Sequence, residues 1–477
     1  MRCIVFIRYC LKYFFLLSSL FLLFCMGCNK LVQIPNPTNS ITAAQTFSSD
    51  ATATAAMLGI YSAMSNPETR AFSNCETTYY PGQSADELTD ESNGNELYDH
   101  FLSNRLTATS DGGTALGYFW QPAYYDIYCA NAVILGVQSS AGVSVATQRQ
   151  LTGEAKFIRA ICYFYLTNLF GDIPLNLSTN FNETALLPRT PQTKVYLQII
   201  SDLHDAARLM IGDFSLSNGQ PIRANKWAAL ALLARVYLFE KNWASADSAA
   251  TAVLNSGQFN LLNDLNQVFL ASSQESIFQL QTPNIYPYST AEGNLFAGKS
   301  LYSWLTPQLM GAFEANDQRR IDWIDSLKRG STVYYRPYKY KSSSVTASLN
   351  SVSENYTVLR LAEQYLIRAE AEANGAGDGA FAAMQDLNTI RSRAGLPPVS
   401  PTLTGDSLMA AVQQEWRIEF FAEWGHRWLD LKRWGNTIQT LDTIPYKRGG
   451  INTNQLLYPI SLSEIQTDPN LTQNPGY

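Results

Sequence analysis

Histidine is scarce in this chain of 477 residues. His100, His204 and His426 are the three that occur, and no two of them have the spacing of metal ligands. This scarcity argues against a histidine-based metal site and against a Ser-His-Asp catalytic triad. We expect no metal and no other cofactor.

Cysteine is equally scarce beyond the first 28 residues. The remaining three, Cys75, Cys129 and Cys162, are odd in number and widely spaced. Such a set does not form a disulfide framework, even in an oxidising compartment. We expect Cys129 and Cys162 to be small apolar residues buried on helices.

The chain also lacks an excess of positive charge. Residues 1–27 carry three cations (Arg2, Arg8 and Lys12) and no acid. Without them, 31 Lys and Arg face 40 Asp and Glu, a net charge of −9. A protein without a basic stripe is not expected to bind nucleic acid.

The first 28 residues have the layout of a secretory signal. A basic opening precedes an apolar run from Tyr13 to Phe24, and Gly27-Cys28 is followed by polar, proline-containing sequence. The run is shorter than the roughly 20 residues that a membrane-spanning helix needs. We therefore predict a signal peptide over 1–27 and lipid attachment at Cys28, which places the mature protein outside the cytoplasm. A plain cleaved signal is the alternative, because Cys25 stands where the lipidation motif usually has leucine.

Apolar periodicity predicts a mainly helical fold, with helices that come in pairs. The spacing of small residues around Lys241-Asn242-Trp243 resembles a tetratricopeptide unit, and a second such pair follows near the C-terminal end. We expect two short strands, at 276–281 and 333–340. The predicted helices span 50–64, 115–138, 147–170, 191–211, 223–240, 242–256, 357–374, 378–394 and 406–424.

Three glutamates, Glu415, Glu419 and Glu423, are spaced to share one face of the last predicted helix. Like charges in such a column repel one another, so cations must lie against them. We interpret the column as a structural ion network and not as a site. The cations nearest in sequence are Arg417, Arg427, Lys432 and Arg433. We interpret Glu154, Lys156 and Arg159 in the same way.

Long irregular segments separate the helices, at 66–114, 257–306, 330–356 and 440–477. Long loops are uncommon unless they have a function. Two of them combine aromatic rings with amide, carboxylate and guanidinium groups, which suits a sugar with its flat face and its rim of hydroxyls. The first carries Tyr79, Tyr80, Asp86, Glu87, Asn93, Asn95, Tyr98 and Arg105, and the second Asn284, Tyr286, Tyr288, Asn294, Tyr302 and Trp304.

Trp304 is the single residue that we most expect to contact ligand, although it could instead cap a helix that starts at Thr306-Pro307. Two other interpretations of the first loop stay open. Asp86, Glu87, Asp90 and Glu91 could supply the carboxylate pair of a glycosidase, and their oxygens could hold calcium, although the EF-hand pattern is missing.

Several motifs, in order along the chain, resemble the SusD/RagB-type nutrient-uptake lipoproteins of Bacteroidetes. The matches depart from the family at Trp416, where it usually has arginine, and at Ser461, where it usually has proline. The matching segments are GEAKFIRA at 153–160, NLFGDIP at 168–174, ALLARVY at 231–237, 359–371, 387–396, HRWLDLKRWG at 426–435 and QNPGY at 473–477.

The resemblance implies one body over 28–477, with an N-terminal part to about 260 and a C-terminal part from about 261, packed as one unit. It implies helix pairs of tetratricopeptide type topped by long loops. It also implies residence on the outer face of the outer membrane, above a SusC-type TonB-dependent transporter. The ligand would be a glycan, or sometimes a peptide, bound in loops of the two regions above and not cleaved.

A helical adaptor that grips a peptide or protein is the alternative function. The position of the exposed aromatic residues discriminates between the two. Aromatic residues gathered in a loop-built hollow favour sugar, and aromatic residues spread along a helical face favour protein.

Overall fold

The computed structural model describes residues 42–66, 72–90, 96–284, 288–298, 303–347 and 352–477. Cys28 and the predicted signal lie outside them. Residues 1–46 form a unit of their own, of which the structure describes helix α2 (Ala43–Thr46). The second unit spans Phe47–Tyr477.

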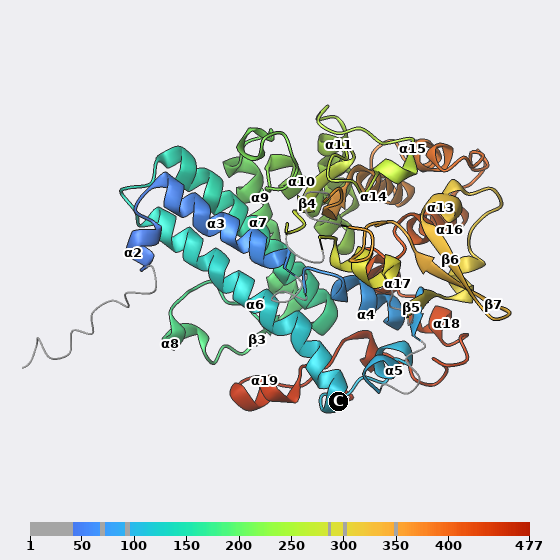
Figure 1. Ribbon diagram of the computed structural model, residues 1–477, viewed down its shortest axis with the longest axis horizontal. Helices are drawn as coiled ribbons and strands as arrows, with labels where there is room; N and C mark the ends of the chain where they lie inside the picture. The colour runs from blue at the N-terminus through green and yellow to red at the C-terminus, as the bar shows by residue number, and fades with distance from the viewer. Residues whose placement is uncertain (1–41, 67–71, 91–95, 285–287, 299–302, 348–351) are drawn as a thin grey trace, which may run out of the picture. The chain divides into compact units, whose positions relative to one another are not determined.

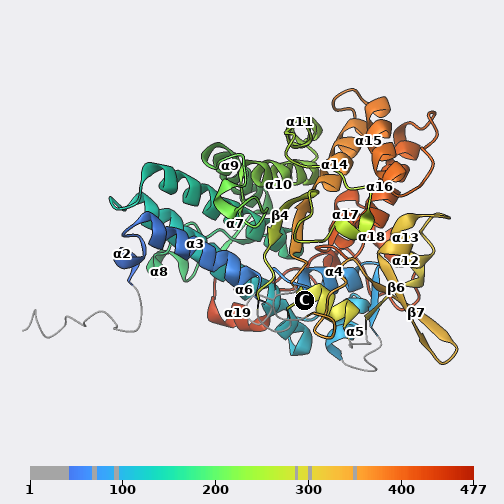
Figure 2. The same ribbon diagram turned by 45° about the horizontal axis from the view of Figure 1, so that its top comes forward.

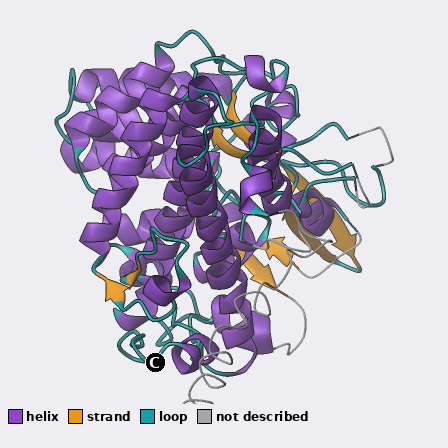
Figure 3. Cartoon of the chain, turned by 90° about the vertical axis from the view of Figure 1, so that its left-hand side faces the viewer, coloured by secondary structure: helices purple, strands orange, loops and turns teal. Residues whose placement is uncertain are grey.

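The second unit is mainly helical, as predicted (Figures 1 and 3). Every predicted helix is present, but the one predicted over 357–374 begins only at Leu361, because residues 357–360 belong to a strand. Local capping explains several boundaries: the Asn225 and Asn242 side chains accept hydrogen bonds from the first turns of α10 and α11. The longer helices are α3 (Asp50–Met64), α4 (Glu76–Ser84), α5 (Glu96–Leu102), α6 (Ser110–Gln138), α7 (Val145–Phe170), α9 (Gln192–Leu209), α10 (Lys226–Phe239), α11 (Trp243–Leu254), α14 (Leu361–Ala373), α15 (Ala380–Arg393), α16 (Gly405–Glu419) and α17 (His426–Trp434). The short ones are α8 (Phe181–Thr184), α12 (Pro307–Met310), α13 (Gln318–Asp322), α18 (Thr437–Leu441), α19 (Leu462–Thr467), three 3-10 turns (Ser215–Ser217, Leu265–Gln267, Asn454–Leu456) and a π-helical turn (Gly293–Ala297).

Helix α7 is the centre of the N-terminal part, where it packs against α3, α6 and α9. Its second half is buried on all sides, as the apolar run from Phe157 to Phe170 predicts. The two predicted helix pairs, α10–α11 and α14–α15, pack against each other through α11 and α14 (Figure 2). Small residues such as Ala246 and Ala362 are fully buried in this contact. The tetratricopeptide-like spacing of small residues is therefore explained by the close packing of these helices.

The strands form four two-stranded antiparallel sheets within the described part of the chain. Strand β4 (Ser276–Leu280) and strand β7 (Thr332–Pro337) match the two predicted strands, with shorter bounds for β7. The pairs are β1 (Leu88–Asp90) with β5 (Ser303–Leu305), β2 (Ile173–Pro174) with β3 (Arg189–Thr190), β4 with β8 (Tyr356–Arg360), and β6 (Ile324–Arg329) with β7.

The prediction that 66–114 is irregular was wrong, since this segment holds α4, β1, α5 and the start of α6. Helix α4 is buried from Thr77 to Ser84 and contains Pro81. A helix that is buried all round and contains proline gives no amphipathic period in the sequence.

Cys75, Cys129 and Cys162 form no disulfide with one another in the described part of the chain. Cys162 is buried as predicted, but the predicted burial of Cys129 was wrong, since it is partly exposed, as is Cys75. Within the described residues, no helix has both the length and the apolar content to cross a membrane.

A buried group of charges connects the C-terminal elements, and we call it the Glu419 cluster. Glu419 contacts three arginines: Arg360 Nη1 at 2.5 Å, Arg319 Nη1 at 3.0 Å, and Arg393 at short range. Burial by itself would raise the pKa of Glu419, but the three arginines lower it well below its ordinary value. The members of the cluster, all buried, are Glu275, Asp317, Arg319, Lys339, Arg360, Arg393, Glu415, Glu419 and Glu423.

The cluster confirms that the glutamate column is a structural ion network, but the predicted cations were wrong. Helix α16 ends at Glu419, so Glu423 approaches from the following turn, where Ala422 and Trp424 have positive φ. The contacting cations come from other elements because the column faces inward. Of the predicted cations, Arg417 and Arg427 contact Asp86, Arg433 contacts Glu370 and Asp430, and Lys432 contacts the Asn168 carbonyl. Glu154, Lys156 and Arg159 form ion pairs with Arg223, Asp205 and Asp202.

We expect Glu419→Gln to lower the free energy of unfolding by about 3–5 kcal/mol, because it leaves three buried arginines short of a negative charge. Urea unfolding followed by circular dichroism measures this. The matched control is Asp205→Asn, which neutralises a partly exposed partner of Lys156 and is expected to cost less than about 1 kcal/mol. Equal losses for the two variants would show that the cluster is not a special constraint.

Candidate functional site

The structure brings the two predicted ligand loops together. Strand β1 from the first loop pairs with β5 from the second, with Thr89 opposite Trp304. Beyond the strands, Thr306 N donates to the Glu87 carbonyl at 2.9 Å, and the Thr306 hydroxyl donates to the Asp86 carbonyl at 2.5 Å. Segments more than 200 residues apart are thus joined by main-chain hydrogen bonds.

Three of the aromatic residues predicted for these loops, Trp304, Tyr79 and Tyr80, are buried. Trp304 is 2% exposed. The centroids of the Trp304 and Tyr334 rings are 4.8 Å apart, and the Arg329 guanidinium carbon lies 5.2 Å from the centroid of the Trp304 ring. It does not cap a helix, because the Thr306 side chain caps α12. Tyr79 and Tyr80 are buried as well, and the Tyr79 hydroxyl donates to Asp90. The rings of Trp304, Tyr79 and Tyr80 are therefore packed inside the protein and leave no ring face open to a sugar.

Asp86 is a structural carboxylate. It is buried, with Oδ1 2.7 Å from Arg427 Nε and Oδ2 2.7 Å from Arg417 Nη2. Burial opposes ionisation, but Arg427 and then Arg417 lower the pKa of Asp86 below its ordinary value. Burial, with help from the neighbouring Asp86 charge, raises the pKa of Glu87 to about 8. Both groups are enclosed, which does not suit a carboxylate pair that must flank a glycosidic bond.

The other residues predicted to bind ligand in the two loops do not form one site in the described part of the chain. Tyr288 is half-buried with φ 57°, Arg105 is exposed, and the Asn294 side chain accepts a hydrogen bond from Ser344 N. Within the described residues, no group of three or more His, Cys, Asp or Glu side chains could hold a metal ion. Tyr286, Tyr302, Glu91, Asn93, Asn95 and the side chain of Tyr98 lie outside what the structure describes.

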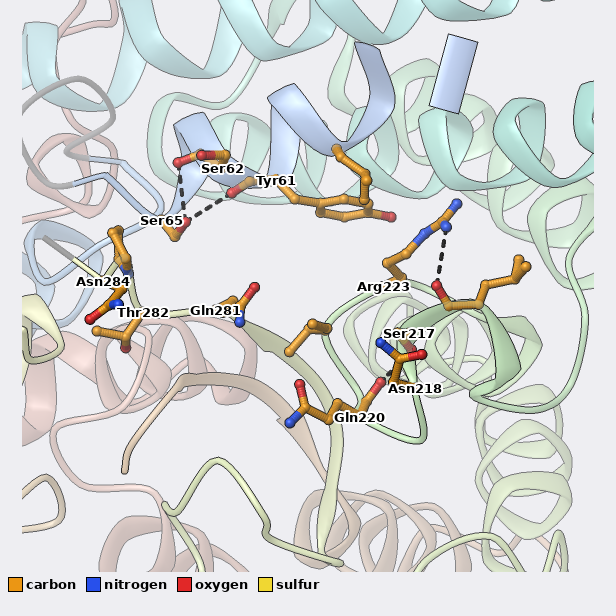
Figure 4. A pocket seen from close by; sticks show the side chains of 14 residues that line it. Tyr61, Ser62, Ser65, Ser217, Asn218, Gln220, Arg223, Gln281, Thr282 and Asn284 are labelled. Atoms are coloured by element: carbon orange, nitrogen blue, oxygen red, sulfur yellow. Dashed lines mark hydrogen bonds between the residues drawn. The ribbon is translucent and has the colours of Figure 1, made fainter. Parts of the chain in front are cut away.

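Asn284, by contrast, lines an open cavity of about 590 Å³, which we call the α3 cavity (Figure 4). Three segments build it. They are the C-terminal half of α3, the loop 216–223 that precedes α10, and the segment 281–284 that follows β4. Its lining residues are Leu58, Tyr61, Ser62, Ser65, Leu216, Ser217, Asn218, Gln220, Ile222, Arg223, Gln281, Thr282, Pro283 and Asn284.

The lining is rich in hydrogen-bonding groups but has no unbalanced charge. Arg223 is the one charged side chain among the described lining residues, and its Nη2 lies 2.6 Å from Glu154 Oε1. Burial raises the pKa of Tyr61 well above its ordinary value, which keeps that hydroxyl neutral. Hydroxyls and carboxamides therefore face the cavity, beside the partly exposed aliphatic side chains of Leu58 and Leu216.

The loop that forms one wall is held in a fixed conformation. Asn218 and Gly219 have φ of 53° and 82°, a left-handed turn that Asn and Gly adopt most readily. The Ser217 hydroxyl donates to the Gln220 carbonyl at 2.5 Å, and Gln279 N donates to the Pro221 carbonyl at 2.7 Å. The second bond ties the loop to β4, so the cavity is formed before any ligand binds.

Asn284 is the one residue of this lining that the sequence predicted. The predicted site residues were grouped around aromatic rings, whereas the cavity is built mainly from serines and amides such as Ser62, Ser65 and Gln220. The sequence gives one indication of this cavity, the polar turn around Asn218-Gly219. This turn lies in the short segment between the predicted helices 191–211 and 223–240.

Comparison with known proteins identifies the family. Residues 308–477 match the model of the SusD family, and residues 36–238 match the model described as "Starch-binding associating with outer membrane". SusD-like protein P25 of Formosa agariphila is 26% identical, with 96% of this chain and 98% of that protein covered. The starch-binding protein SusD of Bacteroides thetaiotaomicron is 24% identical, with 70% of this chain and 74% of that protein covered.

Solved structures show the same fold. A SusD superfamily protein from Bacteroides vulgatus has a TM-score of 0.76 at 23% identity, with 90% of this chain and all of that chain covered. A laminarin-binding SusD-like protein has a TM-score of 0.75 at 23% identity, with the same coverage. The two family models together cover residues 36–238 and 308–477, and the chain belongs to the SusD family.

Proposed function

We propose that this protein is a glycan-binding lipoprotein of the cell surface that captures an oligo- or polysaccharide and passes it, uncleaved, to a SusC-type TonB-dependent transporter. The observation that carries the glycan part is the hydrogen-bonding lining of the α3 cavity, in which the one charged side chain, Arg223, is already paired with Glu154. The descriptions of the matching family model and of the starch-binding relative support the same class of ligand.

The chemistry of the lining favours a neutral sugar. A sugar hydroxyl both donates and accepts, and carboxamides and serine hydroxyls offer both functions at one site. An acidic or basic ligand would need a charged partner, yet Arg223 is already paired with Glu154. Binding exchanges hydrogen bonds to water for hydrogen bonds to protein, so we expect weak to moderate affinity.

Asn284→Ala is expected to weaken glycan binding about 3- to 10-fold, which is the loss of one hydrogen bond between neutral groups. Calorimetry with a panel of neutral polysaccharides measures it. Gln385→Ala, which removes an exposed carboxamide from α15, is the matched control and should bind as the parent does. Absence of heat with every glycan, together with binding of a peptide, would contradict the glycan proposal.

The lipid anchor at Cys28 is part of the proposal and rests on the sequence. Two or three acyl chains would hold the protein firmly, because each buried methylene contributes about 0.8 kcal/mol.

Growth with a clickable palmitate analogue is expected to label the parent chain in the membrane fraction. Cys28→Ser should abolish the label, and Cys25→Leu, which restores the usual residue of the motif, should retain it. Label that persists in Cys28→Ser would contradict the assignment.

One observation favours a second function, contact with a partner protein. The exposed aromatic residues of the described chain do not gather in a hollow; several follow one face of α6. Tyr118, Tyr125, Tyr128 and Leu135 recur at spacings of seven, three and seven, and the last three are 54%, 47% and 56% exposed. A long uncharged row at heptad positions is typical of a helix that packs against another protein. We infer that the transporter contacts this face.

Tyr125→Glu combined with Tyr128→Glu is expected to abolish co-purification with a co-expressed SusC-type transporter of the same genome, since it places two charges in an apolar contact. The melting temperature should not change, because both side chains are exposed. Phe381→Glu on α15, at another exposed aromatic residue, is the control. Unchanged co-purification of the double variant would exclude α6 as the contact.

A further inference from the structure

A second cavity, of about 460 Å³, uses the same loop that walls the α3 cavity, and we call it the Phe259 cavity. The loop 216–223 contributes Gly219, Gln220 and Pro221 to it, and Phe214 lies just before the loop. The other lining residues are Gln258, Phe259, Asn260, Ala271, Ser272, Ser273, Gln274 and Ser276.

The Phe259 cavity repeats the chemistry of the α3 cavity. None of the described residues that line it carries a charge. Three exposed carboxamides, on Gln258, Asn260 and Gln274, lie around it. Two hydrogen bonds join Asn260 to Gln274, one from the main-chain N at 3.0 Å and one from the side-chain Nδ2 at 3.1 Å. These bonds hold two separate segments in one wall and leave Gln258 and the Gln274 amide group on its surface.

The Phe259 cavity adds aromatic rings, which the α3 cavity largely lacks. Phe214 is half-buried and lies edge-on to Phe259, with ring centroids 6.0 Å apart and an interplanar angle of 76°. An aromatic ring beside carboxamides is the combination that suits the apolar face and the hydroxyl rim of a sugar.

Gln220 connects the two cavities. Its side chain is exposed, and it lines both of them (Figure 4 shows it from the α3 side). Strand β4 runs between the same two places, since Ser276 at its start lines the Phe259 cavity and Gln281 just past its end lines the α3 cavity. The bond from Gln279 N to the Pro221 carbonyl fixes the loop on this strand, so the two cavities keep a constant relation.

We propose that the Phe259 cavity is a second carbohydrate subsite and that one extended neutral oligosaccharide occupies both cavities, with the Gln220 carboxamide between them. The proposal rests on the proposed function of the α3 cavity. Such a double site binds polymers more tightly than short sugars. A ligand that fills both cavities gains the contacts of the second cavity without a second loss of translational freedom.

Calorimetry with a disaccharide and a longer oligosaccharide of the same linkage tests the proposal: maltose against maltoheptaose, and laminaribiose against laminarihexaose. We expect the longer sugar of the preferred linkage to bind at least 10-fold more tightly. Gln258→Ala and Gln274→Ala should each weaken the longer sugar about 3- to 10-fold and leave the disaccharide unchanged. Asn284→Ala should weaken both, and Gln385→Ala neither.

The outcomes separate this proposal from the function on which it rests. If long and short sugars bind equally and the Gln258 and Gln274 variants match the parent, the second subsite is overturned while glycan binding stands. If no sugar of either linkage or length binds and a peptide does, glycan binding fails and the subsite fails with it. An oligosaccharide that is weakened by Gln258→Ala but not by Asn284→Ala would overturn the shared occupancy of the two cavities.

Discussion

The buried contact between Arg360 and the glutamates Glu419 and Glu423 constrains more of this molecule than any other interaction. Arg360 stands where β8 ends and α14 begins, and its Nη1 lies 2.5 Å from Glu419 Oε1. A buried charge is costly unless partners surround it, so none of these groups can leave without exposing the others. The contact therefore fixes α16 against the start of α14, and with it the packing of the helix pairs.

The Arg360 contact also fixes the position of the cavities, because it is connected to them through the sheet of β4 and β8. Strand β8 pairs with β4, and Glu275, just before β4, contacts both Arg360 and Arg393. Strand β4 holds the loop 216–223 by the bond to Pro221, and its continuation supplies Gln281 and Asn284. The charges of the Glu419 cluster are thus buried, whereas the lining of the two cavities carries no unbalanced charge. This separation lets a protein with a formal net charge of −6 present a site without net charge.

The sequence predicted the helices and the existence of an ion network but not the site, for physical reasons. A one-sided apolar stripe marked α16 and a long apolar run marked α7, whereas α4 is short, buried all round and interrupted by Pro81, and it has neither signal. The glutamates at 415 and 419 required cations, but cations can come from any part of the chain, and those that came, such as Arg319, are distant in sequence. Trp304 was expected at the surface because aromatic residues suit sugars. In the structure the hairpin β6–β7 covers Trp304 with Tyr334 and Arg329, and no local sequence pattern predicts such a contact.

Hydrogen–deuterium exchange with and without a bound oligosaccharide tests the central claim, that a rigid ion-held frame carries a preformed neutral site. Without ligand, we expect the slowest exchange in α14, α16 and β4, around the Glu419 cluster. With ligand, added protection should appear in 214–223 and 281–284 and leave the frame unchanged. Rapid exchange around the cluster, or protection by sugar that appears elsewhere and not at these two segments, would contradict the account.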